Sequence, residues 1–267
     1  MNAEVAPDLI EAARGYESLF VPALFRPWPK HLLAAVSVGD GAHVVDIACG
    51  TGALTREVLA RAGSSGRVVG VDPASGMLAV AEELAPDIEW MLGSAEALDL
   101  PDASFDCVVS QFGLMFFNDR QQAISEMHRV LKPGGRLAVA VWGSLEANPA
   151  YRDIAALIGD KLGEAAAEAE RLPFSMGDPK ATTSLLEKSG FVSIDVDTIT
   201  EDAAFPSVRQ MVEAELRGWL PLFDIHLDEA AIEDVLAAAE VDLAAYATDG
   251  GEARFPATAN VVSAQKA

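Results

Sequence analysis

Two acidic residues on either side of a glycine-rich turn are the part of this sequence best suited to chemistry. Asp46 lies in an apolar run, the turn around Gly50 and Gly52 follows, and Asp72 comes 20 residues after Gly52. A glycine turn that leads into a helix lets a ligand lie against bare backbone, with helix N–H groups pointing at an anionic group. An acid at the tip of the next strand can accept hydrogen bonds from both hydroxyls of a ribose. The pattern predicts a site for a cofactor that carries adenosine.

The spacing of the glycines distinguishes two classes of cofactor. A dinucleotide-binding turn has the pattern G-x-G-x-x-G, whose third glycine allows close helix packing beneath a pyrophosphate, whereas Thr55 stands at that position here. Asp46 would repel a pyrophosphate, but it suits a ligand that carries an ammonium group. S-adenosylmethionine has an ammonium group, a carboxylate, a sulfonium and a ribose, and no phosphate. The sequence therefore favours S-adenosylmethionine, and an NAD-dependent oxidoreductase is the less favoured alternative.

Short β-rich runs that alternate with helical segments must position these residues. Strands are predicted at residues 43–48, 67–72, 88–93, 105–111 and 136–142, with two more at 191–199 and 253–263. Such alternation predicts an α/β fold with right-handed crossovers and a parallel sheet covered on both faces. We expect a single domain over residues 1–267. Its core is assigned to 36–142, 178–200 and 252–267, and a helical cap to 1–35, 144–177 and 201–251.

The composition limits the partners of the chain. Its 267 residues are 51% hydrophobic, and 19 Lys+Arg against 41 Asp+Glu give a net charge of −22. We expect no nucleic-acid partner, because affinity for phosphates comes from Lys and Arg. The apolar runs are far below the ~18 residues of a membrane span, and the acidic N-terminus is unlike a signal peptide, so we expect a cytoplasmic protein. Cys49 and Cys107 form no C-x-x-C motif, and we expect no metal site.

Four motifs in sequence order resemble those of class I S-adenosylmethionine-dependent methyltransferases. Motif I, the ribose-binding motif, the adenine-contacting segment and the entry to the fifth strand are matched by Val45 to Gly52, Gly70 to Asp72, Ser94 to Asp106 and Leu131 to Leu137. The chain is most similar to the ubiquinone/menaquinone-biosynthesis-like (type 11) subgroup, which acts on small molecules. The resemblance implies a doubly wound, Rossmann-like sheet of seven strands in the order 3-2-1-4-5-7-6, with the last strand antiparallel.

The resemblance also implies which residues bind S-adenosylmethionine and its product S-adenosylhomocysteine. The expected cofactor-binding residues are Tyr16, Asp46, Ala48, Cys49, Gly50, Gly52, Asp72, Pro73, Met77, Ser94, Ala95 and Gln111. Asp46 would take the ammonium group and Asp72 the ribose hydroxyls. Two positions depart from the family pattern: Ala48 stands where many members have glycine, and Ser94 stands where an Asp usually accepts the adenine amino group.

Aromatic and apolar residues of the expected cap predict a pocket for a small apolar or aromatic methyl acceptor. Its expected members are Phe20, Phe25, Trp28, Met115, Phe116, Trp219 and Phe223. His31 and His226 are the candidates for a general base. The implied activity is methyl transfer by in-line displacement, in which the protein mainly aligns the reacting groups.

Three questions stay open at the level of the sequence. A protein of the same fold that binds S-adenosylmethionine without transferring its methyl group is an alternative to the methyltransferase. The identity of the acceptor and the atom that receives the methyl group are not determined. The sequence also fits either a monomer or a homodimer.

Overall fold

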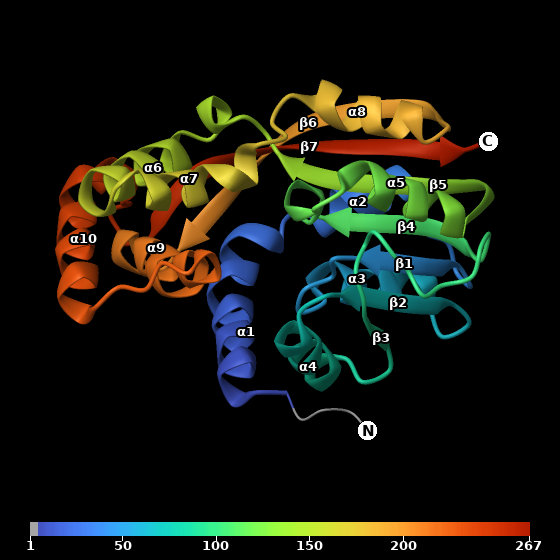
Figure 1. Ribbon diagram of the computed structural model, residues 1–267, viewed down its shortest axis with the longest axis horizontal. Coiled ribbons are helices and arrows are strands. Elements are labelled where there is room, and N and C mark those ends of the chain that lie inside the picture. The colour runs from blue at the N-terminus through green and yellow to red at the C-terminus, as the bar shows by residue number, and fades with distance from the viewer. Residues whose placement is uncertain (1–4) are drawn as a thin grey trace.

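A seven-stranded sheet forms the centre of the computed structural model, which describes residues 5–267 (Figure 1). Its strands are β1 (His43–Ile47), β2 (Arg67–Asp72), β3 (Glu89–Leu92), β4 (Phe105–Gln111), β5 (Leu131–Trp142), β6 (Phe191–Phe205) and β7 (Ala253–Lys266). Their order is β3-β2-β1-β4-β5-β7-β6. The first five strands are parallel, and β7 is antiparallel to both β5 and β6. The expected fold class and strand order are confirmed.

Ten α-helices among the described residues surround this sheet. They are α1 (Pro7–Phe20), α2 (Pro29–Val36), α3 (Ala53–Ala62), α4 (Ser75–Leu84), α5 (Arg120–Val130), α6 (Pro149–Leu162), α7 (Glu164–Arg171), α8 (Pro179–Lys188), α9 (Val208–Ala214) and α10 (Glu229–Asp242). Helices α6, α7, α9 and α10 gather beyond one end of the sheet, and α1 lies between them and α4 (Figure 1). Residues 1–4, which the sequence assigns to the cap, lie outside the described residues.

Burial on both faces explains why the central strands are apolar along their whole length. In β1, the side chains of Val44, Val45 and Ile47 are fully buried, as is typical of parallel strands that helices cover on both sides. Asp46 is the polar exception in this run. Since the carboxyl ends of parallel strands meet at one edge of the sheet, Asp46 of β1 and Asp72 of β2 come to the same edge.

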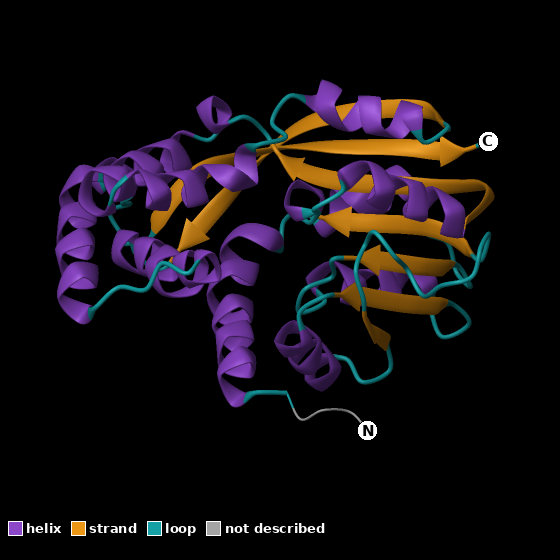
Figure 2. Cartoon of the chain, in the orientation of Figure 1, coloured by secondary structure: helices purple, strands orange, loops and turns teal. Residues whose placement is uncertain are grey.

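Strands β6 and β7 form a long antiparallel pair that extends past the rest of the sheet into the cap (Figure 2). The sequence assigns residues 201–251 to the helical cap, but β6 continues to Phe205, which pairs with Ala253. The extension is stabilised by burial of Ala203 and by stacking of Phe205 on Phe255, with ring centroids 6.2 Å apart. Residues 201–205 are therefore strand and not helical cap.

No helix within residues 5–267 has an apolar stretch long enough to cross a lipid bilayer.

Candidate cofactor site

The turn after β1 adopts a left-handed backbone at three positions. The φ angles are 59° at Ala48, 55° at Gly50 and 83° at Gly52, a region that glycine adopts without steric cost. A Cβ atom at Gly52 would also lie 2.4 Å from the ring of Trp90 on β3, which is closer than real Cβ atoms come to other atoms. Gly52 is therefore required twice, by its backbone conformation and by the ring packed against it.

Ala48 carries strain that a glycine at the same position would not. A residue with a Cβ atom in the left-handed region loses roughly 1–2 kcal/mol, and the φ angle of Ala48 places it there. Its Cβ also lies 2.5 Å from the position that a Cβ of Gly113 would take. The structure thus explains why a glycine suits this position and why residue 113, which faces it, is a glycine.

Asp72 joins the glycine turn to the start of α4. Its Oδ2 accepts a hydrogen bond from the backbone N–H of Gly50 at 2.8 Å, and its Oδ1 accepts one from the N–H of Ala74 at 2.8 Å. Burial raises the pKa of Asp72, and these two backbone donors lower it in part. An ionised carboxylate offers about four lone-pair sites, so both oxygens can accept further bonds from the hydroxyls of a ligand.

Asp46 is a buried acid with one unsatisfied oxygen. Only 1% of the residue is exposed. Its Oδ2 accepts a hydrogen bond from the hydroxyl of Thr55 at 2.6 Å, whereas Oδ1 has no partner within residues 5–267. Burial raises the pKa of Asp46 to about 7, although the Thr55 hydroxyl opposes that shift. A buried acceptor without a donor is rare in folded proteins, and a ligand ammonium group would supply the missing donor.

Tyr16 of α1 lies directly beside the glycine turn. Its ring edge and hydroxyl are 3.8 Å from the position that a Cβ of Gly50 would take. The ring packs against Phe25 and Phe20, with centroids 5.4 Å and 5.9 Å away. Burial and the neighbouring acids Asp72 and Glu17 raise the pKa of Tyr16, so the phenol is neutral at physiological pH. Tyr16 thus forms the wall of the site on the side of α1.

Gln111 and Cys49 are held by backbone contacts near the same turn. Gln111, at the end of β4, donates from Nε2 to the carbonyl of Phe25 at 3.3 Å, and its Oε1 is buried with no partner among the described residues. The N–H of Cys49 donates to the carbonyl of Val71 at 3.1 Å. Burial raises the pKa of the Cys49 thiol, so this cysteine fills space and is a poor nucleophile.

The residues expected at the adenine end differ in exposure. Pro73 and Ser94 are exposed, Met77 is half-buried and Ala95 is buried. The hydroxyl of Ser94 is hydrogen-bonded to the carboxylate of Glu96, which also accepts from the N–H of Asn118 at 2.9 Å. Glu96 is not among the cofactor-binding residues expected from the sequence, and the only local sign of its contact is its position two residues after Ser94. Glu96 links the segment after β3 to the segment before α5.

The expected acceptor pocket divides into two aromatic clusters and two core residues. Phe20 and Phe25 belong to the cluster around Tyr16, whereas Phe116, Trp219 and Phe223 form a second cluster with centroids 5.4 Å and 5.0 Å apart. Trp28 and Met115 are 0% and 1% exposed. Both are packed in the hydrophobic core, and their place in an acceptor pocket stays a prediction.

The reason for the burial of Trp28 is its place in an aromatic stack that the sequence did not indicate. Its ring lies edge-on to Phe112 and Trp142, whose own rings stack at a centroid distance of 3.9 Å. Trp28 is thus covered by aromatic neighbours from β5 and from the segment after β4. This stack is part of the hydrophobic core, next to Phe25.

Neither histidine singled out as a base candidate contacts the glycine turn. Nε2 of His31 lies 2.5 Å from a carboxylate oxygen of Glu201 on β6, which also pairs with Lys30. His226 is 71% exposed and lies 3.3 Å from Asp224 on the surface. The segment between α9 and α10 turns the side chain of His226 to solvent, and the role of either histidine as a base stays a prediction.

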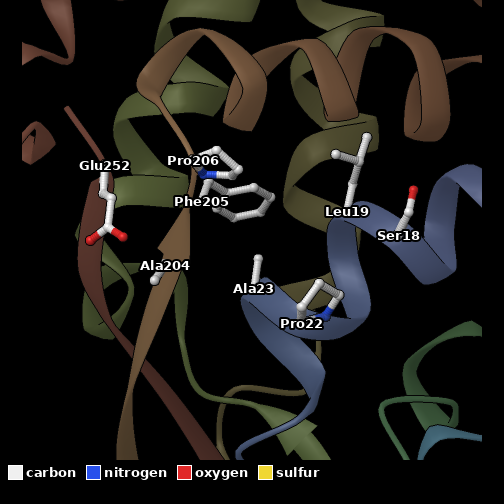
Figure 3. Close-up of a pocket in the computed structure, with 8 residues that line it drawn as sticks. All are labelled: Ser18, Leu19, Pro22, Ala23, Ala204, Phe205, Pro206 and Glu252. Carbon is white, nitrogen blue, oxygen red and sulfur yellow. The ribbon is translucent and has the colours of Figure 1, made fainter. Parts of the chain in front are cut away.

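A cavity of about 230 Å³ lies between the end of α1 and the end of β6 (Figure 3). It is lined by Ser18, Leu19, Pro22, Ala23, Ala204, Phe205, Pro206 and Glu252. None of these residues belongs to the glycine turn, and Phe20 lies edge-on to Phe205 of the lining, with ring centroids 6.3 Å apart. The cavity is therefore separate from the glycine turn. Over residues 5–267, no group of three or more His, Cys, Asp or Glu side chains is placed to hold a metal ion.

Comparison with known proteins places the chain in a family. A family model described as a methyltransferase domain matches residues 45–139. The ubiquinone/menaquinone biosynthesis C-methyltransferase UbiE of Hahella chejuensis is 44% identical over 122 residues, which are 43% of this chain and 49% of that enzyme. The enzyme of the same name from Klebsiella pneumoniae is 31% identical over 194 residues, which are 66% of this chain and 77% of that enzyme. The chain belongs to this methyltransferase family.

The sequence similarity to these relatives is concentrated in one part of this chain. The chain spans about half the length of the first curated relatives that it matches. The solved structure of Haemonchus contortus phosphoethanolamine N-methyltransferase 2 in complex with S-adenosyl-L-methionine has a TM-score of 0.61 and 18% identity, and the match covers 96% of this chain and 57% of that one. At that identity the likeness concerns the fold alone.

S-adenosylmethionine is the cofactor of this methyltransferase family, and the residues of the chain fit it. The unpartnered Oδ1 of Asp46 is an acceptor for an ammonium group, and Asp72 keeps free acceptor capacity for ribose hydroxyls. The bare backbone of Gly50 leaves only the Tyr16 ring within 4 Å of a Cβ position. The individual roles of these residues stay predictions, and the arrangement brings Asp46, Asp72 and Tyr16 to one turn.

Proposed function

We propose that this protein transfers the methyl group of S-adenosylmethionine to a small apolar or aromatic molecule. The observation that carries the proposal is the buried carboxylate of Asp46, whose Oδ1 has no partner within residues 5–267 and lies at the end of β1 beside the glycine turn. Family membership supports the choice of cofactor, and the relatives named C-methyltransferase support transfer of a methyl group. The cytoplasmic location expected from the sequence stays a prediction.

In this proposal the protein binds S-adenosylmethionine, orients it toward the acceptor and covers it from water. S-adenosylmethionine, when bound, supplies a methyl group on a positively charged sulfur that leaves without help from an acid. Asp46 would hold the ammonium group, Asp72 the ribose hydroxyls, and the Oε1 of Gln111 is a further buried acceptor. Tyr16 would exclude water from the glycine turn. When both reactants are held in line, their translational and rotational entropy has already been lost on binding, and this lowers much of the activation barrier without acid–base groups.

The aromatic cluster of Phe116, Trp219 and Phe223 is the proposed contact surface for the acceptor. Phe116 follows β4, at the same sheet edge as Asp46, and is 41% exposed. Gly218, beside Trp219, lies against Phe20, since a Cβ there would be 3.3 Å from the Phe20 ring. The second cluster thus adjoins the first, which contains Tyr16. An acceptor held between the clusters would face the cofactor turn.

Calorimetry and a methyl-transfer assay test the proposal. S-adenosylhomocysteine should bind the protein, and Asp72→Ala should weaken that binding at least tenfold, because two backbone-oriented acceptor oxygens are lost. The exposed Asp99 offers a matched control, so Asp99→Ala should leave the dissociation constant unchanged. Radiolabelled methyl transfer is then measured over phenols, quinols and amines. Stabilisation by NAD and not by S-adenosylhomocysteine in a thermal-shift comparison would contradict the proposal.

A further inference from the structure

Helix α1 covers the glycine turn, but few of its residues are fully buried. Of its 14 residues only Ala13 is buried. Gly15 in its interior weakens the helix, because glycine loses more backbone entropy than other residues. A π-helical turn at Val21–Phe25, which contains Pro22 and buries Val21, Ala23 and Leu24, anchors the chain just after α1. Leu19 and Phe20 pack partly against the core, and polar contacts add to this packing in the middle of α1.

Two hydrogen bonds join the middle of α1 to the glycine turn and to α3, and a third joins α3 to the turn. The Oε2 of Glu17 accepts from the hydroxyl of Thr51 at 2.5 Å, and its Oε1 accepts from Nη2 of Arg56 at 2.8 Å. Nη1 of Arg56 donates to the carbonyl of Thr51 at 2.6 Å, which closes the ring of contacts. Thr51 lies between Gly50 and Gly52 and is 1% exposed. The Glu17 and Arg56 side chains are 22% and 28% exposed, so solvent screens this ion pair only in part.

The contacts of Glu17 help to fix where Tyr16 lies, because the two residues are adjacent in α1, and the Tyr16 ring also packs against Phe25 and Phe20. Tyr16 is the residue that packs beside Gly50. Near its start, α1 also lies against α4, where a Cβ at Gly76 would be 2.4 Å from the carbonyl oxygen of Leu9. Helix α4 follows directly after Asp72. The cover formed by α1 therefore extends from the turn at Gly50 to the helix after Asp72.

We propose that Glu17 and Arg56 are positioning residues that hold Tyr16 over bound cofactor and thereby set how slowly the cofactor leaves. This inference rests on the proposed function, since it assigns the site to S-adenosylmethionine. With the three hydrogen bonds formed, α1 blocks the glycine turn. Release of S-adenosylhomocysteine then requires that the two bonds of Glu17, to Thr51 and to Arg56, break first.

The chain offers a matched control for these contacts. Arg14 and Glu83 form a second ion pair between α1 and the rest of the protein, at 2.9 Å, but their side chains are 60% and 54% exposed. Exposed pairs of this kind contribute little to stability. Removing the Glu83 charge therefore changes the net charge as Glu17→Gln does, without touching the turn.

The rate at which S-adenosylhomocysteine dissociates tests the inference, measured by stopped-flow fluorescence on the full chain. We expect S-adenosylhomocysteine to dissociate roughly five- to tenfold faster from Glu17→Gln and from Arg56→Lys than from the parent protein, because each variant weakens a hydrogen bond to a charged group. The association rate should not fall, because neither variant changes a residue expected to contact the cofactor. Glu83→Gln should match the parent protein in both rates.

Trypsin cleavage after Arg14 gives a readout that does not depend on activity. Cleavage inside a helix requires that the helix opens locally. S-adenosylhomocysteine should protect Arg14 in the parent protein and in Glu83→Gln, and should protect it less in Arg56→Lys, in which the sequence of α1 is unchanged. The thermal unfolding midpoint of the cofactor-free variants should stay close to that of the parent, which separates a positioning role from a loss of overall stability.

Two outcomes would overturn different statements. If S-adenosylhomocysteine binds the parent protein but dissociates from Glu17→Gln and Arg56→Lys at the parent rate, with equal protection of Arg14, the positioning role is refuted and the proposed function stands. If S-adenosylhomocysteine does not bind the parent protein, both the proposed function and this inference fail.

Discussion

Cofactor affinity should depend on pH through Asp46. Burial raises the pKa of this carboxyl to about 7 in the cofactor-free protein, whereas an ammonium group requires the ionised form. From that pKa, roughly one tenth of Asp46 is ionised at about pH 6 and roughly three quarters at about pH 7.5. We therefore expect S-adenosylhomocysteine to bind about eightfold more weakly at the lower pH.

Proton release measured by calorimetry identifies the group that is responsible. Titrations in two buffers with different ionisation enthalpies should show that binding releases close to one proton at about pH 6 and about a quarter of a proton at about pH 7.5. The variant Asp46→Asn should bind more weakly and lose this dependence, while any contribution from Asp72 remains. Thr55→Val removes the hydroxyl that donates to Oδ2, so it should move the midpoint of the pH dependence upward.

The reasoning on Asp46 would be refuted by a flat profile. A dissociation constant that is equal at both pH values, or a pH dependence that survives in Asp46→Asn, would mean that this carboxyl does not meet the ammonium group. The sign of the linkage gives an independent check on the cofactor-free protein. Because the folded state raises the pKa of Asp46, the stabilisation associated with its proton is present below about pH 4 and is lost as pH rises through about 7.

Three further predictions concern stability. Glu170 of α7 and Glu215 are buried together in the cap, and burial raises the pKa of both carboxyls, to about 8 for Glu215. Because folding favours their protonated forms, the thermal unfolding midpoint should fall as pH rises from about 5 to about 8. Glu170→Gln should make this fall smaller. Gly70→Ala would place a Cβ 2.4 Å from the ring of Trp90, so urea unfolding should show a loss of about 1–3 kcal/mol. Ala48→Gly should gain about 0.5–1 kcal/mol in the same assay, because relief of the left-handed strain exceeds the added chain entropy; an unchanged midpoint would argue against that strain.

Local patterns in the sequence predict much of the sheet. Strands β2 (Arg67–Asp72) and β4 (Phe105–Gln111) have the predicted bounds, because an apolar run ended by a turn is a signal that neighbouring residues carry by themselves. Motif order supplied the strand order, including the antiparallel β7. The end of β6 was missed since residues 201–205 are not an apolar run, and pairing with β7 extends the strand.

The candidate site shows the same division. The acids and glycines of the turn follow from the sequence, since their spacing along β1, α3 and β2 is local. The unpartnered oxygen of Asp46, the burial of Trp28 and the exposure of His226 do not. Each depends on which side chains from other elements come close, and a one-dimensional pattern does not contain that information.

By itself, the sequence determined a glycine turn between two acids and the alternation of elements that brings both acids to one sheet edge. Only the tertiary structure decided that Glu17 meets Thr51 and Arg56, 34 and 39 positions further along the chain. The physical reason is that backbone periodicity and turn geometry are encoded over a few neighbouring residues, whereas contacts between distant side chains arise only when complete helices and strands pack.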